Sequence, residues 1–320
     1  MTLFRTRLLL LVALVGLLIV PFFLPNFRVF QLNLMIVYAI AVLGLNILTG
    51  YAGQISLGHG AFYAIGAYTA AALMAHAGFS AYATLPVAGV VCFIAGILMG
   101  FPALRLGGHY LALATFALAM AVPQLLKYKG IAAYTGGVQG IVLSKPEPPF
   151  EFRFFGIALS EDRWLYFVTL AVALPMFWFA SNLVKGRMGR AIIAIRDQPI
   201  AAGALGVNLA WVKTMTFGLS AAYTGIAGAL GAVVIAFVAP DSFHSFVSIS
   251  LLVGVVVGGL GTIWGALFGA AFIQFVPNIA DEISKSAPWA VYGAILIAQI
   301  YVAPGGVMGA LKKLNPGDAK

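Results

Sequence analysis

The sequence predicts an all-α protein, a polytopic membrane helix bundle of about ten transmembrane segments, some of them broken. Hydrophobic residues make up 62% of the 320 residues and charged residues only 8%, whereas about a quarter of the residues of a soluble protein are charged. The apolar residues form runs close to the 20 or so that a helix needs to cross a bilayer. We therefore expect residues 1–320 to form a single transmembrane domain. A nucleic-acid-binding protein is disfavoured, because the basic residues sort by loop.

Five apolar runs precede the longest loop. Arg5 and Arg7 stand before the first run. We expect that run to be a membrane span with its N-terminus in the cytoplasm, because no small-residue cleavage site of a signal peptide follows it. The five runs cover residues 8–24, 27–48, 61–74, 82–99 and 110–126.

Between the second and third runs, glycines and polar residues interrupt the apolar pattern at residues 49–60. Broken backbone at membrane depth is tolerated only where protein or a watery cavity satisfies it, so one interpretation is a discontinuous segment that lines a substrate pathway. The other is close helix packing through small residues. His59 has two interpretations: it contacts the substrate or a gate, or it is a hydrogen-bonded structural residue. The candidate pathway residues are Asn46, Gly53, Gln54, Ser56, Gly58, His59, Tyr110 and Thr115.

The second half of the chain sets the expected topology. Residues 127–163 form the longest loop, which we expect outside the cytoplasm, and apolar runs follow at 164–180, 211–238 and 246–277. Glycines at 258–261 predict that the last of these is two spans joined by a tight turn. With these two spans the total is roughly ten, and both termini are expected in the cytoplasm, together with 11 of the 18 basic residues and two of the nine acidic ones. This asymmetry is the one that membrane insertion favours.

Residues 181–213 are the only long polar interruption with a strong surplus of basic residues, and we expect a cytoplasmic loop there. Residues 197–206 predict a helix of about two turns within it. Asp197 is expected to cap its first N–H groups, Pro199 to fall in its first turn and Gly206 to end it in a left-handed conformation. A short helix outside the bilayer and between two spans suits docking to another protein.

Motifs of common enzyme sites are missing from the sequence. It contains no glycine-rich phosphate loop that ends in Lys-Ser or Lys-Thr, and no His-Glu-x-x-His or Cys/His cluster that would hold a metal. With ten spans, all nine acidic residues fall in loops or at span ends. Ion-coupled carriers keep ionisable groups within their spans, so this pattern favours transport powered by a separate protein. We expect no enzymatic activity and no cofactor in this chain.

A series of ordered motifs resembles those of LivM-type permeases, the inner-membrane subunits of branched-chain amino acid ABC importers. The longest covers residues 53–68, GQISLGHGAFYAIGAY, and the others lie at 110–116, 135–141, 189–196, 201–206, 240–243 and 257–261. The resemblance runs from about residue 30 to residue 305. It implies a multi-pass permease of the bacterial inner membrane. It also implies a second, related permease, two cytoplasmic ATPases that bind the ATP, and an extracytoplasmic substrate-binding protein.

The resemblance further implies a role for the cytoplasmic loop. In importers of this kind a permease helix sits in a groove of the ATPase, and this helix maps onto residues 197–206. Members often carry an acid where this chain has Gly203. The expected substrates are branched-chain or other hydrophobic amino acids. Urea, short amides or aromatic acids are alternatives, as is a self-sufficient channel or secondary carrier. The implied ATPase-coupling residues are Arg190, Arg196, Asp197, Pro199, Ala201, Ala202, Gly203 and Gly206.

Overall fold

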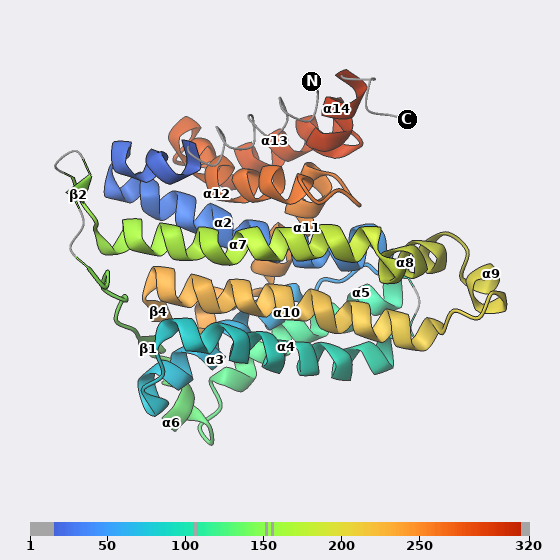
Figure 1. Ribbon diagram of the computed structural model, residues 1–320, viewed down its shortest axis with the longest axis horizontal. Coiled ribbons are helices and arrows are strands. Elements are labelled where there is room, and N and C mark those ends of the chain that lie inside the picture. Colours follow the sequence, from blue (N-terminus) through green and yellow to red (C-terminus); the bar gives the residue numbers. More distant parts are fainter. Residues whose placement is uncertain (1–15, 105, 107, 151–152, 155–156, 315–320) are drawn as a thin grey trace.

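The structure is a computed structural model that describes residues 16–104, 106, 108–150, 153–154 and 157–314, and this part of the chain is mostly helical (Figure 1). Residues 16–23 are helical. The longer helices are α2 (Asn26–Asn46), α3 (His59–Ala77), α4 (Ala81–Ala103), α5 (His109–Leu126), α7 (Glu161–Lys185), α10 (Leu209–Ile235), α11 (Ser245–Gly258), α12 (Gly265–Ile283) and α13 (Pro288–Val302). The shorter ones are the π-helix η1 (Ile47–Tyr51), α6 (Ala132–Thr135), α8 (Arg187–Asp197), α9 (Pro199–Ala204), the 3-10 helix η2 (Pro240–Phe243) and α14 (Gly306–Leu314).

Seven helical segments in the described part of the chain are long and apolar enough to cross a membrane. The prediction of an all-α membrane bundle is therefore confirmed. The other apolar runs also form helices, and α3 and α12 are 19 residues long each. Residues 8–15 of the predicted first span lie outside the described residues, as do Arg5, Arg7 and Arg105.

The apolar run 246–277 is divided as the glycines predicted. α11 ends at Gly258, and Gly259 and Gly261 have φ angles of 117° and 68°, which side-chain-bearing residues rarely adopt. α12 then packs back on α11, and an added Cβ at Gly269 would clash with the carbonyl group of Gly254. The two backbones therefore touch, as small residues allow in membranes.

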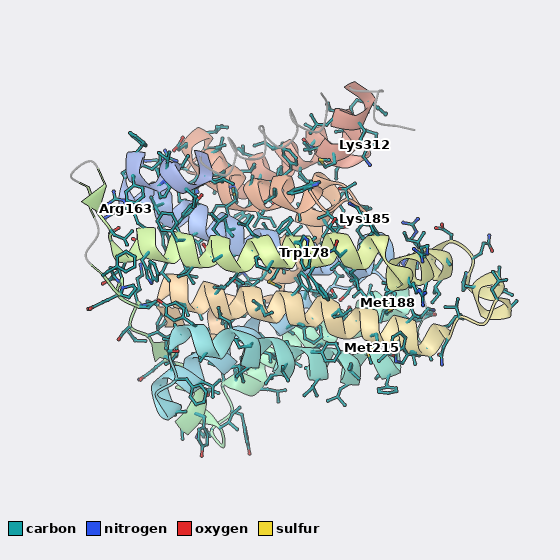
Figure 2. All side chains as sticks on the ribbon, viewed as in Figure 1. Arg163, Trp178, Lys185, Met188, Met215 and Lys312 are labelled. Carbon is teal, nitrogen blue, oxygen red and sulfur yellow. The ribbon has the colours of Figure 1, made fainter. Side chains whose placement is uncertain are left out.

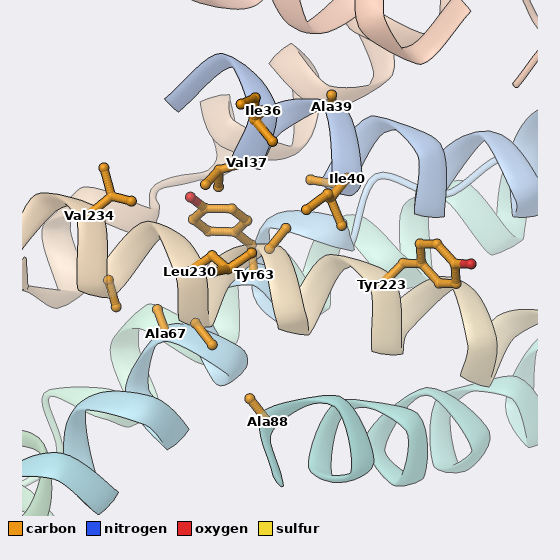
Figure 3. Packing of buried hydrophobic residues seen from close by; sticks show 14 of the residues in the cluster. Ile36, Val37, Ala39, Ile40, Tyr63, Ala67, Ala88, Tyr223, Leu230 and Val234 are labelled. Carbon is orange, nitrogen blue, oxygen red and sulfur yellow. The ribbon is translucent and has the colours of Figure 1, made fainter. Parts of the chain in front are cut away.

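The packing of α10 against α2, α3 and α4 forms the centre of the bundle. Figure 3 shows Val37 of α2, Tyr63 of α3 and Leu230 of α10 meeting there, and all three are buried. A Cβ added at Gly66 or Gly228 would clash with backbone carbonyl groups across the α3–α10 contact. Inside a bilayer no hydrophobic effect drives helices together, so the association of α3 with α10 depends on this close contact between small residues.

The two ends of the bundle differ. Figure 1 places α8 and α9 at one end and the four strands toward the other. Figure 2 shows Lys185 and Lys312 toward the α8 end and Arg163 at the opposite end. The predicted loop 127–163 contains α6 and three strands, which the sequence reading did not anticipate: β1 (Ile141–Val142) pairs with β4 (Phe237–Val238), and β2 (Arg153–Phe154) with β3 (Ile157–Ala158).

Candidate functional site

The predicted break between α2 and α3 is confirmed, and the surrounding protein satisfies several of its polar groups. α2 continues into η1, and residues 52–58 leave the helical conformation before α3 begins. Thr49 Oγ1 donates to the Gln54 carbonyl at 3.1 Å, and the Leu57 N–H donates to Thr115 Oγ1 of α5 at 2.9 Å. A Cβ added at Gly58 would lie 2.8 Å from the carbonyl oxygen of Thr115, so this segment fits tightly against α5.

Asn46 connects the end of α2 to the α11–α12 turn. Its Nδ2 donates to the Thr262 carbonyl at 2.7 Å, and its Oδ1 accepts from the Gly261 N–H at 2.9 Å. The side chain is only 1% exposed. Because both ends of this buried amide are paired with backbone, any displacement of the turn must carry Asn46 with it or break two hydrogen bonds.

His59 lies at the start of α3 in a closed hydrogen-bond network. Its Nε2 is 2.6 Å from Ser220 Oγ of α10, and Ser220 Oγ donates to the Gly44 carbonyl of α2 at 2.6 Å. A carbonyl only accepts, so the single hydroxyl proton of Ser220 is used there and His59 Nε2 must be the donor to Ser220. Nδ1 is then the acceptor for Ser56 Oγ at 3.0 Å.

The His59 ring is fully buried and both ring nitrogens have partners. These surroundings favour the structural alternative for His59, as a joint between α2, α3 and α10. Its contact with substrate stays a prediction.

The remaining pathway candidates differ in their burial and in their hydrogen bonding. Gln54 is buried, with 9% of its surface exposed, and its Nε2 has no hydrogen-bond partner in the described part of the chain. Gly53 is exposed and has φ of 68°. Tyr110 is 72% exposed in the first turn of α5 and does not join the hydrogen-bonded group around the break.

In the basic loop at residues 181–213, one detail of the predicted helix is wrong. Asp197 is the last residue of α8, and the residue before α9 is Gln198, whose side chain makes no capping hydrogen bond. The Asp197 carboxylate instead accepts from Arg196 Nε at 2.8 Å. The carboxylate that was expected to cap the helix is therefore paired with Arg196, the residue before it in the sequence. Pro199 in the first turn of α9 and Gly206 with a positive φ of 86° agree with the prediction.

The loop holds its position through α8, a helix that the sequence reading missed. Gly189, Ile192 and Ile195 are buried at three-residue spacing, which presents one face to the bundle. Ile192 and Ile195 pack in a cluster with Tyr51 and Ala52 at the break.

α9 stands at the tip of the loop with most of its surface exposed. Pro199, Ala201 and Gly203 are exposed, and Ala202 is the buried residue of the helix. Two large apolar side chains on the tip, Ile200 and Leu205, are 88% and 86% exposed. An apolar surface of this kind at the end of a short helix has the form of a contact site for another protein.

Arg196 connects the predicted ATPase-coupling residues to the predicted pathway residues. Its Nη1 donates to the Gly50 carbonyl at 3.1 Å, across 146 positions of sequence. A Cβ added at Gly53 would lie 2.8 Å from Arg196 Cγ. The arginine of the loop thus lies directly against the broken segment. Arg190, by contrast, is exposed and donates to the Lys185 carbonyl at 3.3 Å.

Sequence reading missed several partners of these residues. Ser220 and Ser248 are polar residues within largely apolar helices, which is a signal of a buried hydrogen bond. Ser248 Oγ accepts from the Gly60 N–H at 2.8 Å. Lys213 was placed in the loop but not in the site, although it lies in the wall of the same pocket as Gln54 and Arg196.

Comparison with known proteins gives a family. Residues 28–302 match the family described as the permease component of branched-chain amino acid transport systems. The chain is 33% identical to the LivM permease of the high-affinity branched-chain amino acid transport system of Salmonella typhimurium and 34% identical to that of Escherichia coli, over 94% of this chain and 75% of each relative. It is 28% identical to a probable LivH permease of Methanocaldococcus jannaschii, over 80% of this chain and 84% of that one. No solved structure matches.

Proposed function

The chain belongs to the branched-chain amino acid transport permease family, and we propose that it moves branched-chain or other hydrophobic amino acids across the bacterial inner membrane. It is a permease subunit of an ABC importer and a multi-pass membrane protein. The match over nearly the whole chain to LivM permeases carries the proposal of substrate. An apolar amino acid requires of a conduit little more than smooth walls and polar contacts for its charged groups.

The topology that fits this role has ten membrane crossings and both termini in the cytoplasm. The helical segment at residues 16–23, α2 with η1, and eight further helices (α3, α4, α5, α7, α10, α11, α12 and α13) supply the crossings. Two observations support the orientation. The basic loop around α8 and the C-terminal α14 lie toward the same end of the bundle, and Arg163 of the expected outer loop lies at the other (Figure 2).

The partners that fit this permease are a second, related permease, two cytoplasmic ATPases and an extracytoplasmic binding protein. The exposed apolar tip formed by α9 and Leu205 would seat in an ATPase groove. α8 is packed against the break through Ile192 and Ile195, and Arg196 is bonded to Gly50. A displacement of the tip would therefore reach the broken segment and, through Asn46, the α11–α12 turn.

In this proposal the broken segment forms the inner end of the substrate pathway, and the chain from 1 to 320 acts as a single permease domain. ATP binding and hydrolysis on the partner subunits supply the energy. The outer loop at 127–163 would receive the loaded binding protein, which carries out the selection of substrate.

Reconstitution of the complete importer tests the function. The permease pair and ATPases are placed in proteoliposomes, and uptake of radioactive leucine is measured with the binding protein present. Uptake should require ATP and should stop when the ATPases carry an inactivating substitution. Leucine uptake that continues without the ATPases and follows an ion gradient would refute the importer mechanism.

A cysteine at the tip tests the topology. Leu205→Cys is placed in a Cys92→Ala background, because Cys92 is the only cysteine of the chain. A membrane-impermeant maleimide should label Leu205→Cys in inside-out vesicles from which the ATPases have been stripped, since they would otherwise cover the tip, and not in intact cells. Labelling in intact cells would place the tip outside and remove the basis for its contact with an ATPase.

A further inference from the structure

We propose that a small pocket between the cytoplasmic loop and the broken segment binds a carboxylate group. The pocket has a volume of about 150 Å³ and lies between the break and α8, with Lys213 of α10 also in its wall. The orientation and the identity of the pathway rest on the proposed function. Under that function the pocket is the last site that an amino acid meets before it enters the cytoplasm.

The charges that line the pocket favour an anion. Arg196 and Lys213 contribute two cations to its wall. Among the described residues, Asp197 is the one acid paired with either of them, and its carboxylate accepts from Arg196 Nε. Within the described residues Lys213 forms no ion pair, although its surroundings partly bury it. A partly buried ammonium group without a counter-charge gains from a bound anion more than a fully solvated one does.

Gln54 adds an independent observation. It belongs to the pocket wall, it is more than nine-tenths buried, and its Nε2 has no hydrogen-bond partner in the part of the chain that the structure describes. A buried donor that has lost its water and gained no acceptor is destabilising. A rotation of the side chain toward the pocket would let a ligand oxygen accept its proton.

The three polar side chains together define the ligand. A guanidinium and an ammonium group donate hydrogen bonds and accept none, and the free nitrogen of the Gln54 amide is also a donor. A carboxylate offers two acceptor oxygens and one negative charge, so it complements all three groups. The volume suits the head group of a small acid. The carboxylate can come from the transported amino acid or from another acid of the cytoplasm.

Occupancy of the pocket would also reach the coupling contact. Arg196 donates to the Gly50 carbonyl through Nη1 while its side chain forms part of the pocket wall. A carboxylate bound here would share the guanidinium with Gly50. The departing substrate therefore touches the same side chain that joins the loop to the broken segment.

Protection of a cysteine in the pocket wall tests the proposal. Ile55 lines the pocket and is 41% exposed, so Ile55→Cys in the Cys92→Ala background reports on access. The assembled permease–ATPase complex is placed in inside-out vesicles without ATP, and the rate of alkylation of this chain by N-ethylmaleimide is measured. The probes are isovalerate, L-leucine and leucinamide at equal ionic strength.

Isovalerate and L-leucine should each slow the alkylation about threefold or more, and leucinamide, which lacks the carboxylate, should not. Stronger protection by leucine identifies the transported amino acid as the source, and equal protection identifies any small cytoplasmic carboxylate. Both results support the site. Equal rates with and without both acids, or equal protection by leucinamide, would overturn it.

A matched pair of variants assigns the effect to Lys213. Lys213→Gln should weaken protection by about tenfold in probe concentration, the loss expected for one charge-assisted hydrogen bond, and Lys213→Arg should restore it. Lys185→Gln removes an exposed cation of the same loop that does not line the pocket, and it should leave protection unchanged. Protection that survives Lys213→Gln would refute the assignment.

The outcome is separable from the proposed function. If reconstituted uptake of leucine fails while isovalerate still protects Ile55→Cys, the substrate proposal is wrong and the carboxylate site stands. If uptake succeeds and neither acid protects, the importer stands and the site is wrong.

Discussion

The contact between Gly53 and Arg196 allows the proposed route from the loop to the break to be tested by one methyl group. Gly53 has φ of 68°, and a Cβ there would lie 2.8 Å from Arg196 Cγ. Cγ is close to the base of the side chain, so the whole arginine would have to rotate away. Gly53→Ala should therefore break the hydrogen bond from Arg196 Nη1 to the Gly50 carbonyl.

Gly78→Ala is the matched control. Gly78 has φ of 65°, and a Cβ there meets no atom within 4 Å. Both variants place alanine in the left-handed region, at a cost of about 1–2 kcal/mol. Gly53→Ala loses a charge-assisted hydrogen bond in addition, and because Arg196 is 39% exposed we take the lower limit of about 1.5 kcal/mol. That difference corresponds to a change of about tenfold in the population of the linked arrangement.

The assay is the number of ATP molecules hydrolysed per leucine taken up by the reconstituted importer. Both variants should unfold at a lower temperature than the parent protein. Only Gly53→Ala should raise the ratio of ATP to leucine severalfold, because the ATPases would move a loop that no longer holds the broken segment. Equal ratios for Gly53→Ala and Gly78→Ala would refute transmission through Arg196.

Three further substitutions test separate parts of the site. Gly206 has φ of 86° with no atom within 4 Å of an added Cβ, so Gly206→Val should lower stability by about 1–2 kcal/mol through the backbone alone and uncouple ATP hydrolysis from uptake. Gly206→Asn should retain coupling. Normal transport by the valine variant would contradict a role of the tip in docking. Asn46→Leu removes both hydrogen bonds to the α11–α12 turn, and it should lower stability by about 2–3 kcal/mol and the unfolding temperature with it. Ser220→Ala leaves the Nε2 proton of His59 without its acceptor, at a cost of about 1–3 kcal/mol. An unchanged melting curve would contradict a hydrogen bond between Ser220 and the ring.

Much of the fold could be predicted because its signals are local. Apolar runs marked the helices, and the glycines at 258–261 marked the turn between α11 and α12. The polar and glycine-rich composition of 49–60 predicted the break after α2. Each of these signals comes from the solvation and backbone freedom of neighbouring residues, so no knowledge of distant contacts was needed.

The errors have equally physical origins. Asp197 fits the position before a helix, but a capping preference does not say whether the carboxylate will instead pair with Arg196 beside it. α8 has only a few buried apolar residues, and its charged face gave the appearance of a loop. The partners Ser220 and Gly261 stand 161 and 215 positions away from His59 and Asn46. Contacts across such separations leave no pattern in a single sequence.

The touching backbones of α3 and α10 restrict how this protein can change shape. At Gly66 and Gly228 no side chains separate the two backbones, because an added Cβ there would clash with the carbonyl oxygens of Gly225 and Tyr63. Sliding one helix along the other would bring larger residues into this contact, so we expect the two helices to keep their register. We therefore expect α3 and α10 to move together as one rigid body. Any hinge has to lie outside this pair, in the non-helical stretch at 52–58 and the turn at 259–264. A valine at Gly66 would force α3 and α10 apart.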